Sequence, residues 1–78
     1  MDEVRTELAA KTLAKVFAVA EFGVTESAIT IINTMPVTGA IIAKHSYSIE
    51  LSVMHNNGTW KSHQLAVDVK SGNVTLIY

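Results

Sequence analysis

Three histidines, His45, His55 and His63, are the side chains of this chain best suited to bind a metal ion or to act as a general base. Imidazole nitrogens fill both roles near neutral pH. In the strand register that the sequence favours, all three share one face of a sheet, and His63 lies opposite Leu51. His55 is four residues beyond Leu51 along the same strand. At ~3.3 Å per residue, His55 and His63 are then about 13 Å apart. That distance is too long for shared ligation, so we predict no metal site.

The carboxylates and serines offer no better catalytic group. Glu50 and Asp68 point to the same outer face of the sheet, but the register places them about two outer-face steps apart. General acid and base catalysis needs a cleft that perturbs pKa values, and an open sheet face provides none. The serines have no base in a recognisable nucleophile motif, and no glycine loop is suited to hold a phosphate. We predict that the chain is not an enzyme and binds no cofactor.

The outer sheet face, which points away from the helix, favours binding. The register puts Met54 across from Trp60, near the tip of a hairpin. Trp and Met are enriched at binding hot spots because they bury a large area with adaptable packing. Ile42 and Ile77 share this face, so the predicted partner-binding residues are Trp60, Met54, Ile42 and Ile77. The alternative is that Trp60 only covers its own hairpin by packing on Met54 and Lys61.

Two alternating strands on either side of a glycine turn carry most of these side chains. Apolar residues occupy every second position of each strand, the period of a half-buried strand. A two-residue turn would place the apolar residues of one strand opposite the polar residues of the other, which sheet register disfavours. A three-residue loop with a left-handed Gly58 in a bulge pairs Ile49 with Leu65 and Tyr47 with Val67. The sequence predicts this register.

A helix is predicted from about Glu3 to Phe22, with Asp2 as its N-cap and Gly23 at its end. At 100° per residue, one stripe is expected against the sheet: Ala9, Leu13, Val16, Phe17 and Ala20, with Val24 beyond the helix. On the far side a mixed group is expected: Leu8, Val19 and Phe22 around Lys11 and Lys15. These side chains form either scattered exposed positions or a second contact surface. The spacing of Glu7 and Lys11 also permits an exposed ion pair.

The remaining elements complete a four-stranded meander. Residues 27–34 are rich in β-branched side chains and predict a first strand. Residues 40–43 are expected to run into the second strand. A Ser71-Gly72 turn, or a four-residue loop of the same parity, pairs Val69 with Val74 in the last hairpin. The predicted fold is α+β, a single domain over residues 1–78 with one N-terminal helix packed on a four-stranded antiparallel sheet.

Composition narrows the possible partners. The chain has 78 residues, of which 49% are apolar and 17% charged, and this is more apolar residue than so small a core hides. The excess favours a protein partner or a homodimer. A formal net charge of −1 with only six scattered Lys and Arg residues argues against nucleic acid. Without cysteine there is no disulfide and no thiolate zinc site.

Localisation is predicted from the apolar runs and the N-terminus. No apolar stretch is long enough to span a membrane, so no membrane insertion is expected. Residues 1–3 lack the basic start and apolar run of a secretory signal. The chain as written is predicted to be cytoplasmic, and it would be secreted or periplasmic if a signal peptide had been removed.

The last 32 residues contain three segments that carry a family resemblance, Tyr47-Ser48-Ile49-Glu50-Leu51, Asn57-Gly58-Thr59-Trp60 and Val67-Asp68-Val69-Lys70-Ser71-Gly72-Asn73-Val74. They resemble the end of a PepSY-type domain, a small cystatin-like arrangement. The resemblance implies a non-enzymatic module in a secreted or membrane-associated setting, often beside peptidases that it restrains. The chain departs from the family in lacking an export signal. It also lacks the Q-x-V-x-G loop of true cystatins, so no inhibitory residues are carried over.

Together these observations predict a non-enzymatic protein-binding module, an inhibitor or regulator of a partner enzyme such as a peptidase. One alternative is a self-assembling structural homodimer joined through a sheet edge or the outer face. Another is a phage or mobile-element accessory protein that blocks a host enzyme.

Overall fold

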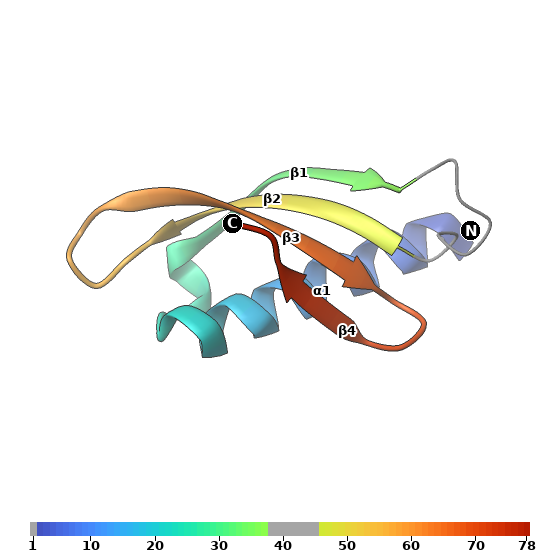
Figure 1. Cartoon of the computed structure of the whole chain (residues 1–78), viewed down its shortest axis with the longest axis horizontal. Helices are drawn as coiled ribbons and strands as arrows, with labels where there is room; N and C mark the ends of the chain where they lie inside the picture. Colours follow the sequence, from blue (N-terminus) through green and yellow to red (C-terminus); the bar gives the residue numbers. More distant parts are fainter. Residues whose placement is uncertain (1, 38–45) are drawn as a thin grey trace.

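The computed structural model describes residues 2–37 and 46–78, with side chains described from residue 6 onward (Figure 1). Its elements are the helix α1 (Asp2–Phe22), a short 3-10 helix η1 (Glu26–Ala28) and four strands, β1 (Ile29–Pro36), β2 (Ser46–Met54), β3 (Trp60–Asp68) and β4 (Asn73–Leu76). The strands form one antiparallel sheet in the order β1-β2-β3-β4. This confirms the predicted α+β class and the helix followed by a meander.

The core lies between α1 and one face of the curved sheet (Figure 1). From the helix it receives Ala10, Ala14 and Ala18, which stand one turn apart and have no exposed surface. From the sheet it receives the largest fully buried side chains, Ile49, Leu51, Leu65, Val53 and Val67. Because alanine methyl groups are short, the helix lies close against the strands that supply the largest fully buried side chains.

The helix face predicted from the sequence is partly wrong. Leu13 and Phe17 pack against the core and Val24 is buried, as expected. Val16, however, is 63% exposed, and Ala20 is exposed as well. The branched side chains of β2 and β3 already fill the inner face of the sheet, so the alanine stripe fits there and a stripe with valine does not.

The hairpin between β2 and β3 has the predicted register. Ile49 pairs with Leu65, Tyr47 with Val67, and Met54 with Trp60. In the three-residue loop the N–H of Gly58 donates to the His55 carbonyl at 2.8 Å, and the N–H of His55 donates to the Thr59 carbonyl at 2.9 Å. Gly58 has a φ of 81°, which confirms the left-handed bulge.

The last hairpin keeps the predicted parity, but its register is shifted by two residues. Val67 pairs with Val74 and Leu65 with Leu76, so the predicted pairing of Val69 with Val74 is wrong. The Asp68 carboxylate accepts hydrogen bonds from the N–H groups of Lys70 and Ser71 at 3.0 and 3.4 Å. These bonds hold a four-residue loop at 69–72, and the ladder ends at the pair Asp68–Asn73.

Strand β1 is an edge strand with an interrupted ladder. Its register with β2 shifts between Ile31 and Asn33, which leaves Ile32 in a bulge, 51% exposed. The strand ends at Pro36, which cannot donate a ladder hydrogen bond. Residues 40–43, which were predicted to run into the second strand and include Ile42, lie outside the described part of the chain. His45 lies outside it as well.

Candidate functional site

The predicted partner-binding pair is present on the outer sheet face. Met54 and Trp60 are direct cross-strand partners next to the β2–β3 loop. Their exposed fractions are 41% and 51%, so neither side chain is part of the core. Direct cross-strand pairing places the two side chains side by side, and together they form an apolar tip on an otherwise mixed face.

The other two predicted contact residues do not extend this tip. Ile77 is 57% exposed and follows β4, where its N–H donates to the main-chain oxygen of Gln64 at 2.8 Å. Gln64 is four residues from Trp60 along β3, about 13 Å of strand. Ile42 lies outside the described residues. Of the three predicted contact residues that the structure describes, it therefore brings together Met54 and Trp60.

Polar side chains occupy the middle of the outer face. Gln64 donates a hydrogen bond to the Ser48 hydroxyl, and its carbonyl oxygen accepts one from the Tyr78 hydroxyl at 3.5 Å. Glu50 pairs with Gln64 and Asp68 with Ser46, as predicted, so the two carboxylates are well separated on an open surface. This arrangement offers no cleft for acid and base catalysis.

The prediction that His55 and His63 lie too far apart to meet is wrong. His63 is opposite Leu51, as expected, yet the Nε2 atoms of the two histidines are 3.0 Å apart. The sequence estimate counted strand rise alone. Strand side chains lean along the strand direction, and two imidazoles that lean toward each other span the gap.

The two imidazoles belong to a small cluster at the C-terminal end of α1. The Phe22 ring stacks on His63 with centroids 4.3 Å apart and meets the edge of His55 at 5.2 Å. His63 is 9% exposed, and its Nδ1 lies 3.1 Å from the main-chain oxygen of Tyr78. Both ring nitrogens of His63 are therefore engaged, which gives this cluster a structural role in tying the helix end to the sheet.

No metal centre is found in the part of the chain that the structure describes. No three side chains of His, Cys, Asp or Glu converge there. The rings of His55 and His63 meet almost end to end, since their centroids are 5.2 Å apart at a nitrogen separation of 3.0 Å. Their Nε2 atoms thus point at each other and do not converge on a third point, where a shared ion would lie.

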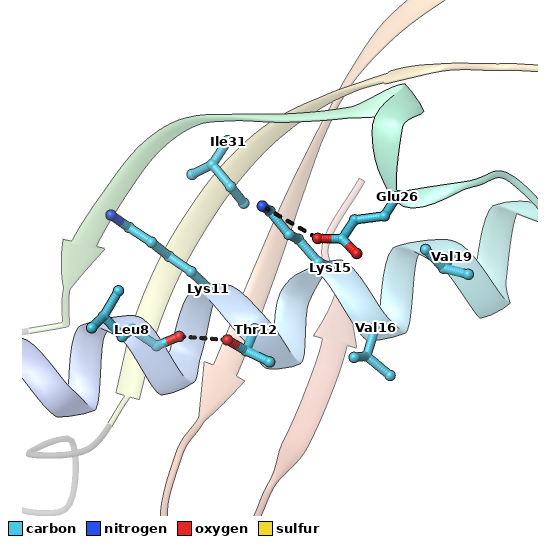
Figure 2. Close-up of a pocket in the computed structure, with 8 residues that line it drawn as sticks. All are labelled: Leu8, Lys11, Thr12, Lys15, Val16, Val19, Glu26 and Ile31. Atoms are coloured by element: carbon cyan, nitrogen blue, oxygen red, sulfur yellow. Dashed lines mark hydrogen bonds and ion pairs between the residues drawn. The ribbon is translucent and has the colours of Figure 1, made fainter.

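A groove of about 680 Å³ runs between α1 and β1 on the helix side of the molecule (Figure 2). Its lining residues come from three elements: Leu8, Lys11, Thr12, Lys15, Val16 and Val19 from α1, Glu26 from η1, and Ile31 from β1. Lys11 and Lys15 extend from the helix toward β1 (Figure 2). This volume lies within the range of ligand sites.

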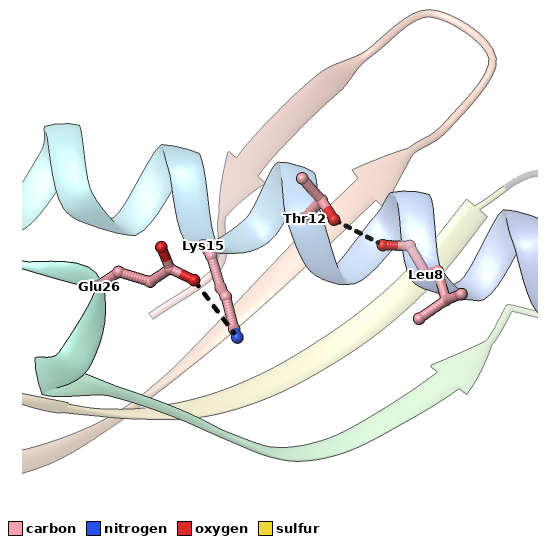
Figure 3. Close-up of polar contacts among 4 residues, drawn as sticks. All are labelled: Leu8, Thr12, Lys15 and Glu26. Carbon is pink, nitrogen blue, oxygen red and sulfur yellow. Dashed lines mark hydrogen bonds and ion pairs between the residues drawn. The ribbon is translucent and has the colours of Figure 1, made fainter.

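Two polar contacts lie within the groove (Figure 3). The ammonium of Lys15 is 3.9 Å from the Glu26 carboxylate, and the Thr12 hydroxyl donates to the Leu8 carbonyl at 2.9 Å. The ion pair that the sequence predicts between Glu7 and Lys11 does not form. Among the described side chains, the ion pair lies between Lys15 and Glu26.

Sequence reasoning identified only part of the groove. It grouped Leu8 and Val19 around Lys11 and Lys15, either as scattered exposed positions or as a second contact surface. The structure places these four side chains along one concave surface. It missed Val16, which had been assigned to the core. It also missed the walls that Glu26 and Ile31 supply, because no local pattern shows that β1 returns alongside the helix.

Comparison with known proteins adds no further constraint. No protein-family model, curated protein or solved structure matches this chain.

Across residues 2–37 and 46–78, no helix combines the length and the apolar character needed to cross a bilayer.

Proposed function

We propose that this chain is a non-enzymatic protein-binding module that inhibits or regulates a partner enzyme, with Trp60 and Met54 at the centre of the contact. The observation that carries the proposal is the exposure of Trp60, 51%, beside Met54 on the sheet face opposite the core. A tryptophan held on a paired strand offers a large, rigid, amphipathic surface, which is typical of binding hot spots.

The nature of the partner follows from the resemblance to PepSY-type domains in the C-terminal half. That resemblance supports a peptidase as the enzyme that is restrained. Among the described side chains, both ring nitrogens of His63 are engaged, and the outer-face carboxylates Glu50 and Asp68 stand apart. A binding role without chemistry is consistent with these features.

The experiment is to replace Trp60 with alanine and to compare binding by the wild type and the variant. The immobilised wild type is used to capture a partner, whose affinity for Trp60→Ala is then measured by calorimetry. Loss of a hot-spot tryptophan weakens binding by about 2 kcal/mol, roughly 30-fold. Ile77→Ala is the matched control, because Ile77 is equally exposed but lies away from the pair.

Two results would contradict the proposal. One is an unchanged affinity of Trp60→Ala for the captured partner. The other is a large loss of folding stability in Trp60→Ala, measured by urea denaturation, because Trp60 would then serve to hold its own hairpin. A homodimer remains the second candidate, since the same exposed pair is able to contact a second copy of the chain.

A further inference from the structure

The apolar side chains of α1 are arranged by size in an unusual way. The helix buries its smallest residues, Ala10, Ala14 and Ala18, against the sheet. Leu13, Phe17 and Phe22 pack partly against the same core, whereas Leu8 and Val16 are left 56% and 63% exposed. Exposing these side chains gains nothing for the isolated fold, since burying a Val or Leu side chain stabilises a protein. The outward apolar face of α1 therefore needs an explanation of its own.

The side chains of α1 that line the groove, apart from the lysines, follow one line along the helix, and Val19 in this line is partly buried against the core. Leu8, Thr12, Val16 and Val19 follow one another at spacings of four, four and three residues, so they lie on one face of the helix. From Leu8 to Val19 the line spans eleven residue steps, about 17 Å at ~1.5 Å per residue. Lys11 and Lys15 stand on the β1 side of this line, one helical turn apart (Figure 2).

Both lysines are available to an incoming anion. The contact between Lys15 and Glu26 spans 3.9 Å, and the two side chains are 38% and 75% exposed, so solvent screens it strongly. Among the described side chains, no carboxylate pairs with Lys11. The groove thus combines a mainly apolar line with two adjacent ammonium groups, of which that of Lys15 also faces the Glu26 carboxylate, while the chain as a whole carries a net charge of −1.

We propose that the groove between α1 and β1 binds an amphipathic α-helix of a partner protein, one that carries two carboxylates a helical turn apart beside an apolar stripe. An apolar line with the spacing of one helix face is suited to the corresponding stripe of a second helix. Two ammonium groups one turn apart match Glu or Asp residues at positions i and i+4 of that helix. A fatty acid has a single carboxylate and would supply one negative charge for the two ammonium groups.

This surface is separate from the proposed Trp60 contact. Met54 and Trp60 lie on the outer face of the sheet, whereas the groove lies on the side of the sheet that α1 covers. The two proposals therefore fail or succeed independently, and each has variants that leave the other surface unchanged.

The test uses a labelled synthetic peptide that is long enough to cover the line, with Leu at i, i+4, i+8 and i+11 and two flanking Glu residues four apart. Fluorescence anisotropy measures its affinity for the wild type and for Lys11→Glu combined with Lys15→Glu. We expect the double variant to bind at least ~10-fold more weakly, because each attraction becomes a repulsion. Lys61→Glu combined with Lys70→Glu makes the same charge change elsewhere and leaves the affinity unchanged.

A second pair of measurements separates charge from shape. A peptide with Lys in place of both Glu residues is expected to regain affinity for the double variant. Val16→Asn, whose site is 63% exposed and outside the core, is expected to lower binding of the Glu peptide by about tenfold without changing the urea midpoint. Raising the salt concentration weakens binding of the Glu peptide to the wild type.

Four outcomes overturn the proposal. The first is equal affinity of the wild type for the Glu peptide and for one with Gln in both places. The second is unchanged binding by Val16→Asn. The third is that dodecanoate displaces the Glu peptide and binds with a higher affinity than the peptide. This result would assign the groove to a lipid. The fourth is a wild-type dimer that Val16→Asn converts to a monomer, which would assign the groove to a second copy.

Discussion

The contact between His55 and His63 determines which ring nitrogens carry protons. A main-chain oxygen only accepts hydrogen bonds, so the Nδ1 of His63, 3.1 Å from the oxygen of Tyr78, must be the donor. In the neutral ring, Nε2 of His63 is then an acceptor. The Nε2 of His55 lies 3.0 Å from it and supplies the proton between the two rings. Each ring is thereby restricted to one tautomer.

This leads to a prediction about the two neutral imidazoles. His63 is expected as the Nδ1–H tautomer and His55 as the Nε2–H tautomer. Two-bond proton–nitrogen correlation spectra of ¹⁵N-labelled protein, recorded under mildly alkaline conditions, distinguish the two forms. The variant His55→Phe removes the donor and serves to assign the signals. A His63 ring that carries its proton on Nε2 would contradict the hydrogen-bond network described above.

A second residue-level prediction concerns Asp68 in the loop between β3 and β4. Its Oδ1 accepts the N–H groups of Lys70 and Ser71 at 3.0 and 3.4 Å. Replacement by alanine removes this acceptor, and we expect the free energy of unfolding to fall by about 1 kcal/mol. Urea denaturation measures the change. Asp68→Asn is the matched control, because its amide oxygen still accepts; a loss as large as that of Asp68→Ala would mean that charge, and not the hydrogen bonds, stabilises the loop.

At the scale of the elements, the position of α1 depends on how small its buried face is. Ala10, Ala14 and Ala18 have no exposed surface and face strands whose side chains are fully buried. Close-packed interiors respond to added volume as well as to lost volume. The alanine stripe therefore sets the distance between the helix and the sheet, and through it the shape of the groove beside β1.

We expect Ala14→Leu to lower the free energy of unfolding by about 1–3 kcal/mol, because three added carbons have no space between α1 and the sheet. Ala20→Leu makes the same change at an exposed position of the same helix and is expected to alter stability by less than about 0.5 kcal/mol. Urea denaturation of both variants provides the comparison. Equal effects of the two substitutions would mean that α1 does not pack through its alanines.

The sequence was sufficient to predict the elements whose register is set by alternation. The β2–β3 hairpin was predicted correctly because a shift by one residue would have turned Leu65 to the polar face. The register of the last hairpin was not predicted correctly. A register shift of two residues keeps Val74 and Leu76 on the inner face, so the alternation of apolar residues does not distinguish the two registers. Here the side chain of Asp68 decided the register, and turn chemistry of this kind leaves only a weak pattern.

The candidate sites were predicted unequally for the same reason. Met54 and Trp60 meet through strand register alone, so their pairing was predictable. The groove depends on which face of α1 turns inward and on where β1 lies, and both are tertiary outcomes. The meeting of His55 and His63 depends on side-chain reach in a twisted sheet, which residue spacing does not report.

At the scale of the whole molecule, the sheet edges are poorly suited to self-assembly. β1 has a bulge between Ile31 and Asn33 and ends at Pro36, and both features interrupt the row of free N–H and C=O groups. At the other edge, β4 has only four residues. Short, bulged and proline-containing edges limit pairing between sheets. Any homodimer would then have to use the outer face or the groove.

We therefore expect the isolated chain to be a monomer of 8.4 kDa whose mass does not change with concentration. Light scattering over a wide concentration range measures the mass, and Trp60 fluorescence reports on the outer face in the same samples. A side chain that is 51% exposed is expected to emit at the long wavelengths of a hydrated indole. Trp60 is the single tryptophan of the chain, so the signal has one source.

The two readouts together distinguish the possible fates of the exposed apolar surface. A monomer with hydrated Trp60 leaves both the outer face and the groove free for foreign partners, as proposed. A dimer whose formation shifts Trp60 emission to shorter wavelength would mean that a second copy covers the outer face, and the search for a foreign partner would then move to the groove. A dimer with unshifted Trp60 emission would instead place the second copy on α1, and Val16→Asn would be expected to dissociate it.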